Sequence, residues 1–322
     1  MPPNSQHDIE VLIEEQYVVE TQIRHHGLRP EDSMITLEPP NSEDILSNEY
    51  IESVIAEHAS TTAVLLLPGI QYYSGQLLDI PHLTAFARER GIFVIWDLAH
   101  AVGNVPLSLH DWSVDAAAWC TYKYLNGGPG CIGGLFVHER HAQVGDDGKH
   151  NVRLAGWWGN DKKSRFAMRP GFKPVPGAAG FQLSNPSVLD ITSLCASLEV
   201  FSLAGGLTPL RAKSKKLTAY LVSELYRLPE DMGGYWRIIT PGEEDRRGAQ
   251  ISVLLADGLL DDVMAGLERR GVLVDERRPN VIRVAPAPLY NTFGDCYDFV
   301  VAFKGALEEA LDAKWKREQM DE

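Results

Sequence analysis

The chain has 322 residues, of which 44% are hydrophobic and 23% are charged, and its formal net charge is −14. This length allows two domains with a sizeable core, and the composition is ordinary for a globular protein. The acidic balance argues against a nucleic-acid-binding surface. Residues 1–6 are polar and unlike a signal peptide, and no apolar run approaches the length of a membrane-spanning helix.

The four cysteines are Cys120, Cys131, Cys195 and Cys296. They form no C-x-x-C pair, and nothing in their spacing indicates a disulfide framework or a zinc site. We therefore expect reduced thiols, as in cytoplasmic proteins, and no metal site. The histidines at positions 25, 26, 138 and 141 are expected to be surface residues.

The first sixty residues are expected to be largely helical. Residues 8–22 mix charged and apolar positions, which favours a helix, and residues 32–41 are expected to form a loop or a short strand. The apolar positions of residues 42–58 recur at helical spacing, which predicts an amphipathic helix.

The next stretch has the pattern of a βαβ unit. The apolar run at residues 62–67 ends at Pro68 and predicts a buried strand. A helix should follow between Pro81 and Gly91, because proline is common at helix starts and glycine just beyond helix ends. Residues 92–96 then predict a second strand, and this order implies a parallel sheet.

Glycine-rich segments organise the next hundred residues. Residues 114–121 predict a third strand, and a glycine-rich stretch then leads to residues 135–137, which should return antiparallel to it. Residues 156–186 are rich in glycine, proline and polar residues and predict a long loop, a type of segment that is often functional. A helix should start near Pro186, with Ser184 or Asn185 as its cap, and run past Leu203.

The remaining chain has the pattern of an α+β domain. Helices are predicted at residues 208–225 and 259–269, and strands at residues 236–239, 250–255 and 281–285. We expect a first domain over residues 1–190 and a smaller C-terminal domain over residues 191–322.

Asp97 and Lys123 are the first candidates for chemistry. Asp97 ends the second predicted strand and Lys123 follows the third, and ligands of open α/β sheets bind at such strand ends. Pyridoxal phosphate (PLP) chemistry needs a lysine that binds the cofactor and a carboxylate that keeps its pyridine nitrogen protonated. The pair suits this division of labour; alternatively, Asp97 caps a helix and Lys123 is a surface charge.

Five segments carry a family resemblance. They are DLAHAVGN at residues 97–104, WCTYKYLN at 119–126, GWWG at 156–159, FQLSNP at 181–186 and IRVAP at 282–286. Together and in this order they resemble kynureninases, which are class V aminotransferase-like PLP enzymes of fold type I. The resemblance runs from about His26 almost to the C-terminus. It implies an α/β fold with a mostly parallel sheet in a partial PLP-binding large domain, followed by a smaller α+β domain.

The resemblance implies roles for four residues near the cofactor. Lys123 would bind PLP covalently and shuttle the proton at the substrate α-carbon, while Asp97 would pair with the pyridine nitrogen. His100 would lie near the ring, and Tyr122 would contact the phosphate and serve as a proton donor. Without this resemblance, His100 would be read as a core histidine and Tyr122 as a half-buried aromatic.

The resemblance assigns three further residues to the edges of the site. Trp157 and Asn185 would complete the cofactor site from the partner subunit of a homodimer, and Arg283 would bind the substrate α-carboxylate through a bidentate pair. Trp157 is otherwise a half-buried aromatic and Asn185 a turn or cap residue. Arg283 lies in an apolar stretch, so either an internal carboxylate or a ligand should meet it.

The implied reaction is the hydrolysis of L-kynurenine to anthranilate and L-alanine, or of 3-hydroxy-L-kynurenine to 3-hydroxyanthranilate and L-alanine. It belongs to tryptophan catabolism and NAD biosynthesis and takes place in the cytoplasm. Full-length kynureninases also have a long N-terminal stretch that precedes this match and supplies part of the phosphate-binding loop, a ring-stacking aromatic and a substrate-recognising histidine. We find no match to it here, and therefore expect a sheet that lacks several strands, exposed apolar surface and weak cofactor retention.

Three other interpretations stay open at this point. A cysteine desulfurase or related lyase of the same superfamily would typically carry histidine before the lysine, where this chain has Tyr122, and a reactive cysteine in a mobile loop. An inactive relative would act only as a binding or assembly partner. A generic nucleotide-binding domain is disfavoured, because no glycine fingerprint follows the first predicted strand of the βαβ unit.

Overall fold

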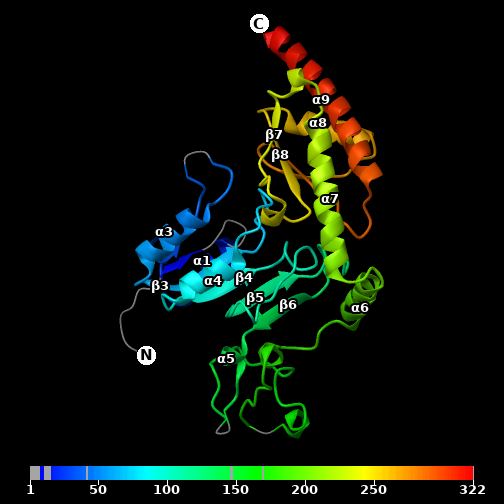
Figure 1. Ribbon diagram of the computed structural model, residues 1–322. Helices are drawn as coiled ribbons and strands as arrows, with labels where there is room; N and C mark the ends of the chain where they lie inside the picture. Colours follow the sequence, from blue (N-terminus) through cyan, green and yellow to red (C-terminus); the bar gives the residue numbers. More distant parts are fainter. Residues whose placement is uncertain (1–7, 11–15, 41–42, 146–147, 169, 322) are drawn as a thin grey trace.

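Two sheets, each packed with its own helices, form the described part of the chain (Figure 1). The computed structural model describes residues 8–10, 16–40, 43–145, 148–168 and 170–321. The first sheet has six strands in the order β2-β1-β3-β4-β5-β6, and the second has four in the order β7-β8-β10-β9. The strands of the first sheet are β1 (Asp8–Glu10), β2 (Met34–Ile35), β3 (Thr62–Pro68), β4 (Phe93–Asp97), β5 (Ala116–Cys120) and β6 (Gly133–Val137).

The predicted βαβ unit is confirmed as β3, α4 (Ile80–Arg88) and β4, with the two strands parallel. Alternate side chains of the two strands are fully buried, among them Leu67 and its register partner Trp96. The indole N–H of Trp96 donates to Thr84 Oγ1 on α4 over 2.9 Å, so the one polar atom of this large side chain is satisfied in the core. This packing brings Asp97 to the carboxyl edge of the sheet.

The first predicted helix is wrong at its beginning. Residues 8–10 form strand β1, which pairs in parallel with β2 and β3, and helix α1 (Gln16–His25) begins later. Pairing in the sheet satisfies backbone groups through partners distant in sequence, and this outweighs a local helical pattern. Two more helices follow, α2 (Pro30–Ser33) and α3 (Asn48–His58). The predictions for residues 1–6 lie outside the described residues.

The expected antiparallel return is confirmed by β6, which pairs with β5. Gly134 is the register partner of Trp119, and a Cβ at Gly134 would lie only 2.1 Å from the Trp119 indole. The glycine is therefore needed for the indole to lie across the neighbouring strand.

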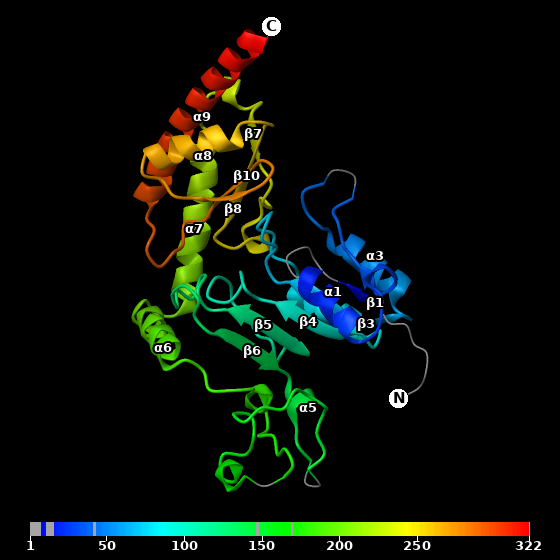
Figure 2. The same ribbon diagram turned by 180° about the vertical axis from the view of Figure 1, so that it is seen from behind.

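Beyond β6 the chain leaves the sheet. After the short helix α5 (Glu139–Ala142), the described part of residues 143–187 has no further α-helix or named strand; it contains two 3-10 turns, η1 (Arg165–Ala167) and η2 (Ala178–Phe181), and two isolated β-bridges. Figure 2 shows this segment on the side of the first sheet that faces away from the second sheet. It contains the long loop that was predicted at residues 156–186.

Two consecutive helices then connect the sheets. Helix α6 (Val188–Leu203) is capped by Ser187, whose Oγ accepts from Asp190 N over 3.3 Å, and not by Ser184 or Asn185 as expected. Phe201 is the only α6 residue classed as buried, and the exposed apolar residues of this helix include Leu189 and Leu203. Helix α7 (Leu207–Leu225) packs instead against the second sheet. The predicted boundary at residues 190 and 191 falls inside α6, and this division stays a prediction.

The C-terminal part is the expected α+β unit with two additional elements. Its antiparallel sheet consists of β7 (Trp236–Ile238), β8 (Ile251–Leu255), β9 (Asp275–Arg277) and β10 (Val281–Val284), and helices α7, α8 (Leu260–Arg269) and α9 (Phe293–Asp321) cover it. The sequence pattern did not predict β9 or α9. Strand β9 consists of three charged residues, so it has no alternation of apolar and polar positions.

The loop after β3 ties the two sheets together. Its backbone oxygens accept hydrogen bonds from three side chains of the second unit: Thr240 Oγ1 donates to Ser74 O over 2.5 Å, Ser252 Oγ to Tyr73 O over 2.6 Å and Gln250 Nε2 to Tyr72 O over 2.9 Å. This loop therefore sets how the second sheet faces the carboxyl edge of the first.

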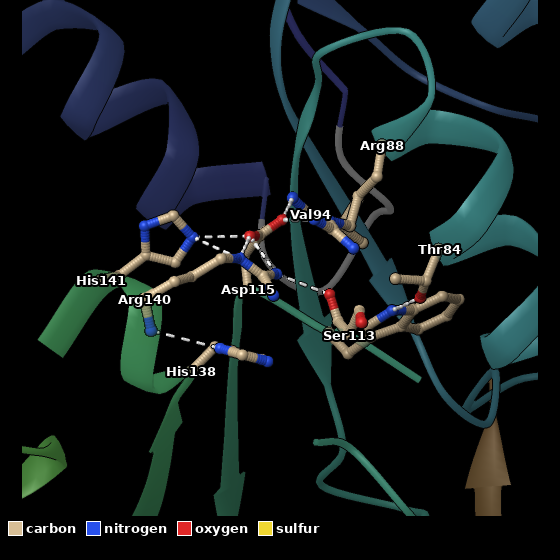
Figure 3. Close-up of polar contacts among 9 residues, drawn as sticks. Thr84, Arg88, Val94, Ser113, Asp115, His138, Arg140 and His141 are labelled. Atoms are coloured by element: carbon tan, nitrogen blue, oxygen red, sulfur yellow. Dashed lines mark hydrogen bonds and ion pairs between the residues drawn. The ribbon is translucent and has the colours of Figure 1, made fainter. Parts of the chain in front are cut away.

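A buried carboxylate anchors the opposite, amino edge of the first sheet (Figure 3). Asp115 precedes β5, and its side chain is only 5% exposed. It accepts from Val94 N over 2.9 Å and contacts Arg140 Nε at 3.0 Å and His141 Nε2 at 2.6 Å. The cluster ties α5 to the beginnings of β4 and β5.

Across the described ranges, no single helix is long and apolar enough to cross a membrane; α6 and α7 pass that test only as a pair bent by 76°. The same part of the chain contains no group of three or more His, Cys, Asp and Glu residues that could hold a metal ion.

Candidate active site

A cavity of about 800 Å³ lies where the carboxyl edge of the first sheet faces the second sheet. Four of the predicted site residues line it: His100, Tyr122, Lys123 and Arg283. Its volume falls within the range of about 300–1,000 Å³ that is typical of small-molecule sites. The first unit contributes the residues that follow β4 and β5, and the second contributes residues from β9 and β10.

Lys123 and His100 lie next to each other in the wall of this cavity. Lys123 Nζ lies 3.0 Å from His100 Nε2, and His100 is only 7% exposed. Burial, and then the positive charges of Lys123, Arg283 and Arg277, lower the pKa of His100 to about 3. His100 is therefore neutral near pH 7, and its Nε2 can accept a hydrogen bond from the Lys123 ammonium.

The turn that carries His100 is held from both sides. Asn104 Nδ2 donates to the His100 carbonyl over 3.0 Å, while Asn104 Oδ1 accepts from Ala249 N of the second unit over 3.0 Å. Asn104 thereby links the backbone at His100 to the second sheet.

Asp97 lies at the carboxyl end of β4 and is half-buried. Its Oδ1 accepts a hydrogen bond from Ala99 N over 2.8 Å, which fixes the carboxylate at the start of the turn that leads to His100. It is not among the residues that line the cavity. Its pairing with a pyridine nitrogen stays a prediction.

Arg283 enters the cavity from β10, with a side chain that is only 10% exposed. One guanidinium nitrogen, NH1, donates to Tyr72 O over 3.0 Å, and NH2 pairs with Asp275 on β9. Asp275 is thus the internal carboxylate partner that burial of an arginine requires.

Two tyrosines flank Lys123 in different environments. Tyr122 is 48% exposed, and Lys123 Nζ lies 5.9 Å from the centre of its ring. Tyr124 is less exposed, and burial raises the pKa of its phenol to about 12. Tyr122 is therefore the better placed of the two to exchange protons with solvent.

The structure does not bring Trp157 and Asn185 to the cavity. Trp157 is 44% exposed and contacts Phe166, with 5.3 Å between ring centres, in the long segment after β6. Asn185 is exposed on the stretch before α6. Neither residue lines the cavity, and their contribution from a partner subunit stays a prediction.

The sequence reasoning missed several residues of the cavity wall. They are Tyr124, Asn126, Gln250, Asp275, Arg277 and Tyr290. Tyr124 and Asn126 lie in the kynureninase-like segment at residues 119–126, so their closeness to Lys123 in sequence could have predicted their place in the cavity wall. Asp275 and Arg277 reach the cavity only because β9 pairs with β10, and no local pattern shows this pairing.

The charge of the cavity is opposite to that of the whole chain. Lys123, Arg277 and Arg283 contribute three positive charges to its wall, Asp275 contributes one negative charge, and His100 is neutral. The chain as a whole has a net charge of −14. A locally positive cavity of this size can hold an anionic cofactor and a substrate carboxylate, so the residues present fit a phosphate-bearing group such as PLP.

Solved structures with the same fold define the class. The match to the cysteine desulfurase CsdA from Escherichia coli covers 95% of this chain and 74% of the CsdA chain, with a TM-score of 0.72 and 19% sequence identity. The match to a C-DES mutant with glycine covalently linked to the PLP cofactor covers 94% of this chain and 75% of the C-DES chain, with a TM-score of 0.75 and 16% sequence identity. The chain therefore has the α/β fold of fold-type-I PLP enzymes, as predicted.

Sequence comparison narrows this class. Residues 210–303 match the family model of the kynureninase C-terminal domain. Kynureninase 2 of Neurospora crassa is 65% identical over 302 residues, which cover 91% of this chain and 64% of that protein. The chain is thus a relative of the kynureninases over nine-tenths of its own length, and it spans less than two-thirds of this relative's length. The cysteine desulfurases are only distant relatives in fold.

Proposed function

We propose that this chain carries the cofactor lysine and the carboxylate-binding arginine of a kynureninase. The reaction is the PLP-dependent hydrolysis of L-kynurenine, or its 3-hydroxy form, to anthranilate, or 3-hydroxyanthranilate, and L-alanine. The enzyme is a cytoplasmic homodimer that acts in tryptophan catabolism and NAD biosynthesis. The single observation that carries the proposal is the meeting of His100, Lys123 and Arg283 in one positively charged cavity.

PLP, when bound, supplies an electron sink that stabilises negative charge on a substrate carbon. The residues of this chain hold the reactants and move the protons. Lys123 binds the cofactor through its amine and then transfers the proton at the substrate α-carbon. Asp97 would accept the hydrogen bond of the pyridine nitrogen, and neutral His100 would add no charge to the site. Arg283 binds the α-carboxylate through its planar guanidinium.

Water supplies the oxygen that ends on anthranilate, and the bond between the β- and γ-carbons breaks. The alanine fragment then needs a proton from Tyr122 or Lys123. Tyr122 lines the cavity and is 48% exposed, so it can regain a proton from solvent. Trp157 and Asn185 would complete the cofactor site of the partner subunit. Their exposure in the single chain is consistent with this role. If Tyr122→Phe kept the full rate of cleavage, the role of Tyr122 as proton donor would be wrong.

The first experiment is a visible absorption spectrum of the purified chain after PLP is added, before and after borohydride. We expect a cofactor band that borohydride reduces and that Lys123→Ala abolishes. Lys162→Ala is the matched control, because Lys162 is an exposed lysine far from the cavity in sequence. The same band in Lys123→Ala would contradict the role of Lys123.

The second experiment separates the reaction classes. We expect the loaded chain to release fluorescent anthranilate from L-kynurenine and to form no persulfide from cysteine. Persulfide formation without anthranilate would favour the desulfurase interpretation, and neither product would favour a binding or assembly partner.

A further inference from the structure

Arg283 already has a carboxylate partner, and this partner comes from the chain itself. Arg283 on β10 and Asp275 on β9 are register partners in an antiparallel pair, and Arg283 NH2 pairs with Asp275 Oδ2. The Arg283 side chain is 10% exposed, whereas that of Asp275 is 50% exposed. The arginine that would bind a ligand carboxylate is therefore occupied by a carboxylate that water can reach.

A second arginine holds the other oxygen of Asp275. Arg277 NH1 lies 2.8 Å from Asp275 Oδ1, and Arg277 lines the same cavity. Arg283 also donates from NH1 to Tyr72 O over 3.0 Å, so its guanidinium is oriented by the backbone as well as by Asp275. Each oxygen of Asp275 thus faces a different guanidinium.

We propose that Asp275 is an internal competitor of the substrate carboxylate at Arg283, and that Arg277 retains Asp275 when the ligand binds. This inference rests on the proposed function, because that function makes Arg283 the carboxylate site. Arg283 exchanges one carboxylate for another, and Asp275 stays paired with Arg277. The buried Arg283 therefore always has a carboxylate partner, and the half-exposed Asp275 keeps Arg277 as its own.

The negative charge of Asp275 sets the affinity in this arrangement. A second carboxylate close to the same guanidinium repels the ligand and neutralises part of the charge that attracts it. The opposite possibility is that Asp275 only orients Arg283, in which case its loss would weaken binding. Asp275→Asn distinguishes the two, because it removes the charge and keeps an oxygen that accepts a hydrogen bond.

Titration calorimetry of the full chain with L-alanine, the aliphatic product of the proposed reaction, tests this exchange. L-Alaninamide is the matched ligand without a carboxylate. We expect Asp275→Asn to bind L-alanine about threefold to tenfold more tightly and to show no gain for L-alaninamide, since only the carboxylate feels the lost charge. Asp261→Asn is the matched control, because Asp261 is exposed, pairs with Arg278 at 2.7 Å and lies outside the cavity wall.

Arg277→Gln should act in the opposite direction. It leaves the displaced Asp275 without an ion-pair partner, so displacement from Arg283 becomes harder and L-alanine should bind about twofold to fivefold more weakly. In Asp275→Asn the further change Arg277→Gln should have a much smaller effect, because there is no longer a charge to retain.

Unchanged or weaker binding of L-alanine to Asp275→Asn, with an unchanged melting temperature, would overturn the proposal and make Asp275 an orienting residue. Failure of L-alanine to bind either form would overturn it too, since Arg283 would then not be a carboxylate site. Anthranilate release is measured separately. Tighter L-alanine binding without anthranilate release would sink the proposed function and leave the exchange of ion pairs intact.

Discussion

The two ends of strands β4 and β5 each carry a carboxylate, a histidine and cations, but their charges are satisfied differently. At the amino ends, Asp115 is enclosed and accepts hydrogen bonds from Val94, Arg140 and His141 (Figure 3). Burial favours the neutral form of Asp115, but these hydrogen bonds outweigh it and lower the pKa of its carboxyl. At the carboxyl ends, His100, Lys123 and Arg283 border an open cavity with an excess of positive charge.

The difference distinguishes a structural cluster from a candidate active site. In the Asp115 cluster the charges are paired within the chain, so the cluster stabilises the fold. In the cavity, positive charges lie near one another and near His100, whose pKa is lowered by burial and then by these charges. This arrangement favours the binding of an anionic ligand. Such sites commonly reduce stability in exchange for function.

The largest effect that we expect is loss of activity in Lys123→Ala. L-Kynurenine turnover should fall at least about a thousandfold, equivalent to about 4 kcal/mol in activation free energy. The melting temperature of the unliganded chain should stay the same or rise, because one of the mutually repelling cations is removed. Steady-state kinetics and thermal unfolding check the two parts, with Lys162→Ala as the control. A marked fall in melting temperature would make Lys123 a structural residue.

Asp115→Ala should have the opposite profile. Removal of this carboxylate leaves Arg140 partly buried without its main partner, which should lower the free energy of unfolding by about 3–5 kcal/mol. Urea unfolding measures this change. Asp111→Ala is the control, because Asp111 is exposed. A loss below about 1 kcal/mol would contradict the structural role, since exposed ion pairs contribute no more than this.

His100→Gln should make stability less dependent on pH. The pKa of His100 is lowered to about 3 from 6.5, so between these values the unfolded chain binds a proton that the folded chain does not. The wild-type protein therefore loses stability as the pH falls below about 6.5. Between pH 6.5 and pH 5 the free energy of unfolding of the variant should fall by about 2 kcal/mol less than that of the wild-type protein.

Urea unfolding at several pH values measures this difference. Groups other than residue 100 contribute equally to both proteins, so the comparison isolates His100. Parallel pH profiles for the two proteins would show that His100 titrates normally in the folded state.

Arg140→Lys should have the smallest effect, a loss of about 1–2 kcal/mol in the free energy of unfolding. Lysine keeps the positive charge but cannot donate from several nitrogens at once to Asp115 and to Ser113 O, which Arg140 NH2 contacts at 2.6 Å. Thermal and urea unfolding measure the change, with Arg227→Lys as the control, because the Arg227 side chain is 73% exposed. A loss as large as that of Asp115→Ala would mean that the fork geometry matters as much as the charge.

Local patterns predicted most of the elements that position the site. Apolar runs with proline and glycine boundaries predicted β3, α4 and β4, and the return of β6 was predicted from the glycine-rich segment before it. The same patterns failed at β1, where pairing with β2 and β3 overrides a helical pattern, and at β9, whose residues are all charged. Strand pairing depends on distant residues, and local periodicity does not contain that information.

The sequence by itself determined that Asp97 ends one strand and that Lys123 follows the next strand along the chain, and its motifs indicated a kynureninase-like chain with His100, Tyr122 and Arg283 as site residues. Only the tertiary structure decided which charges meet. It brought Arg283 from the second sheet to the edge of the first, paired it with Asp275, and left Trp157 and Asn185 outside the cavity. The physical reason is that electrostatic partners are selected by distance in space and by burial, and these are set by the packing of the two sheets through the loop after β3.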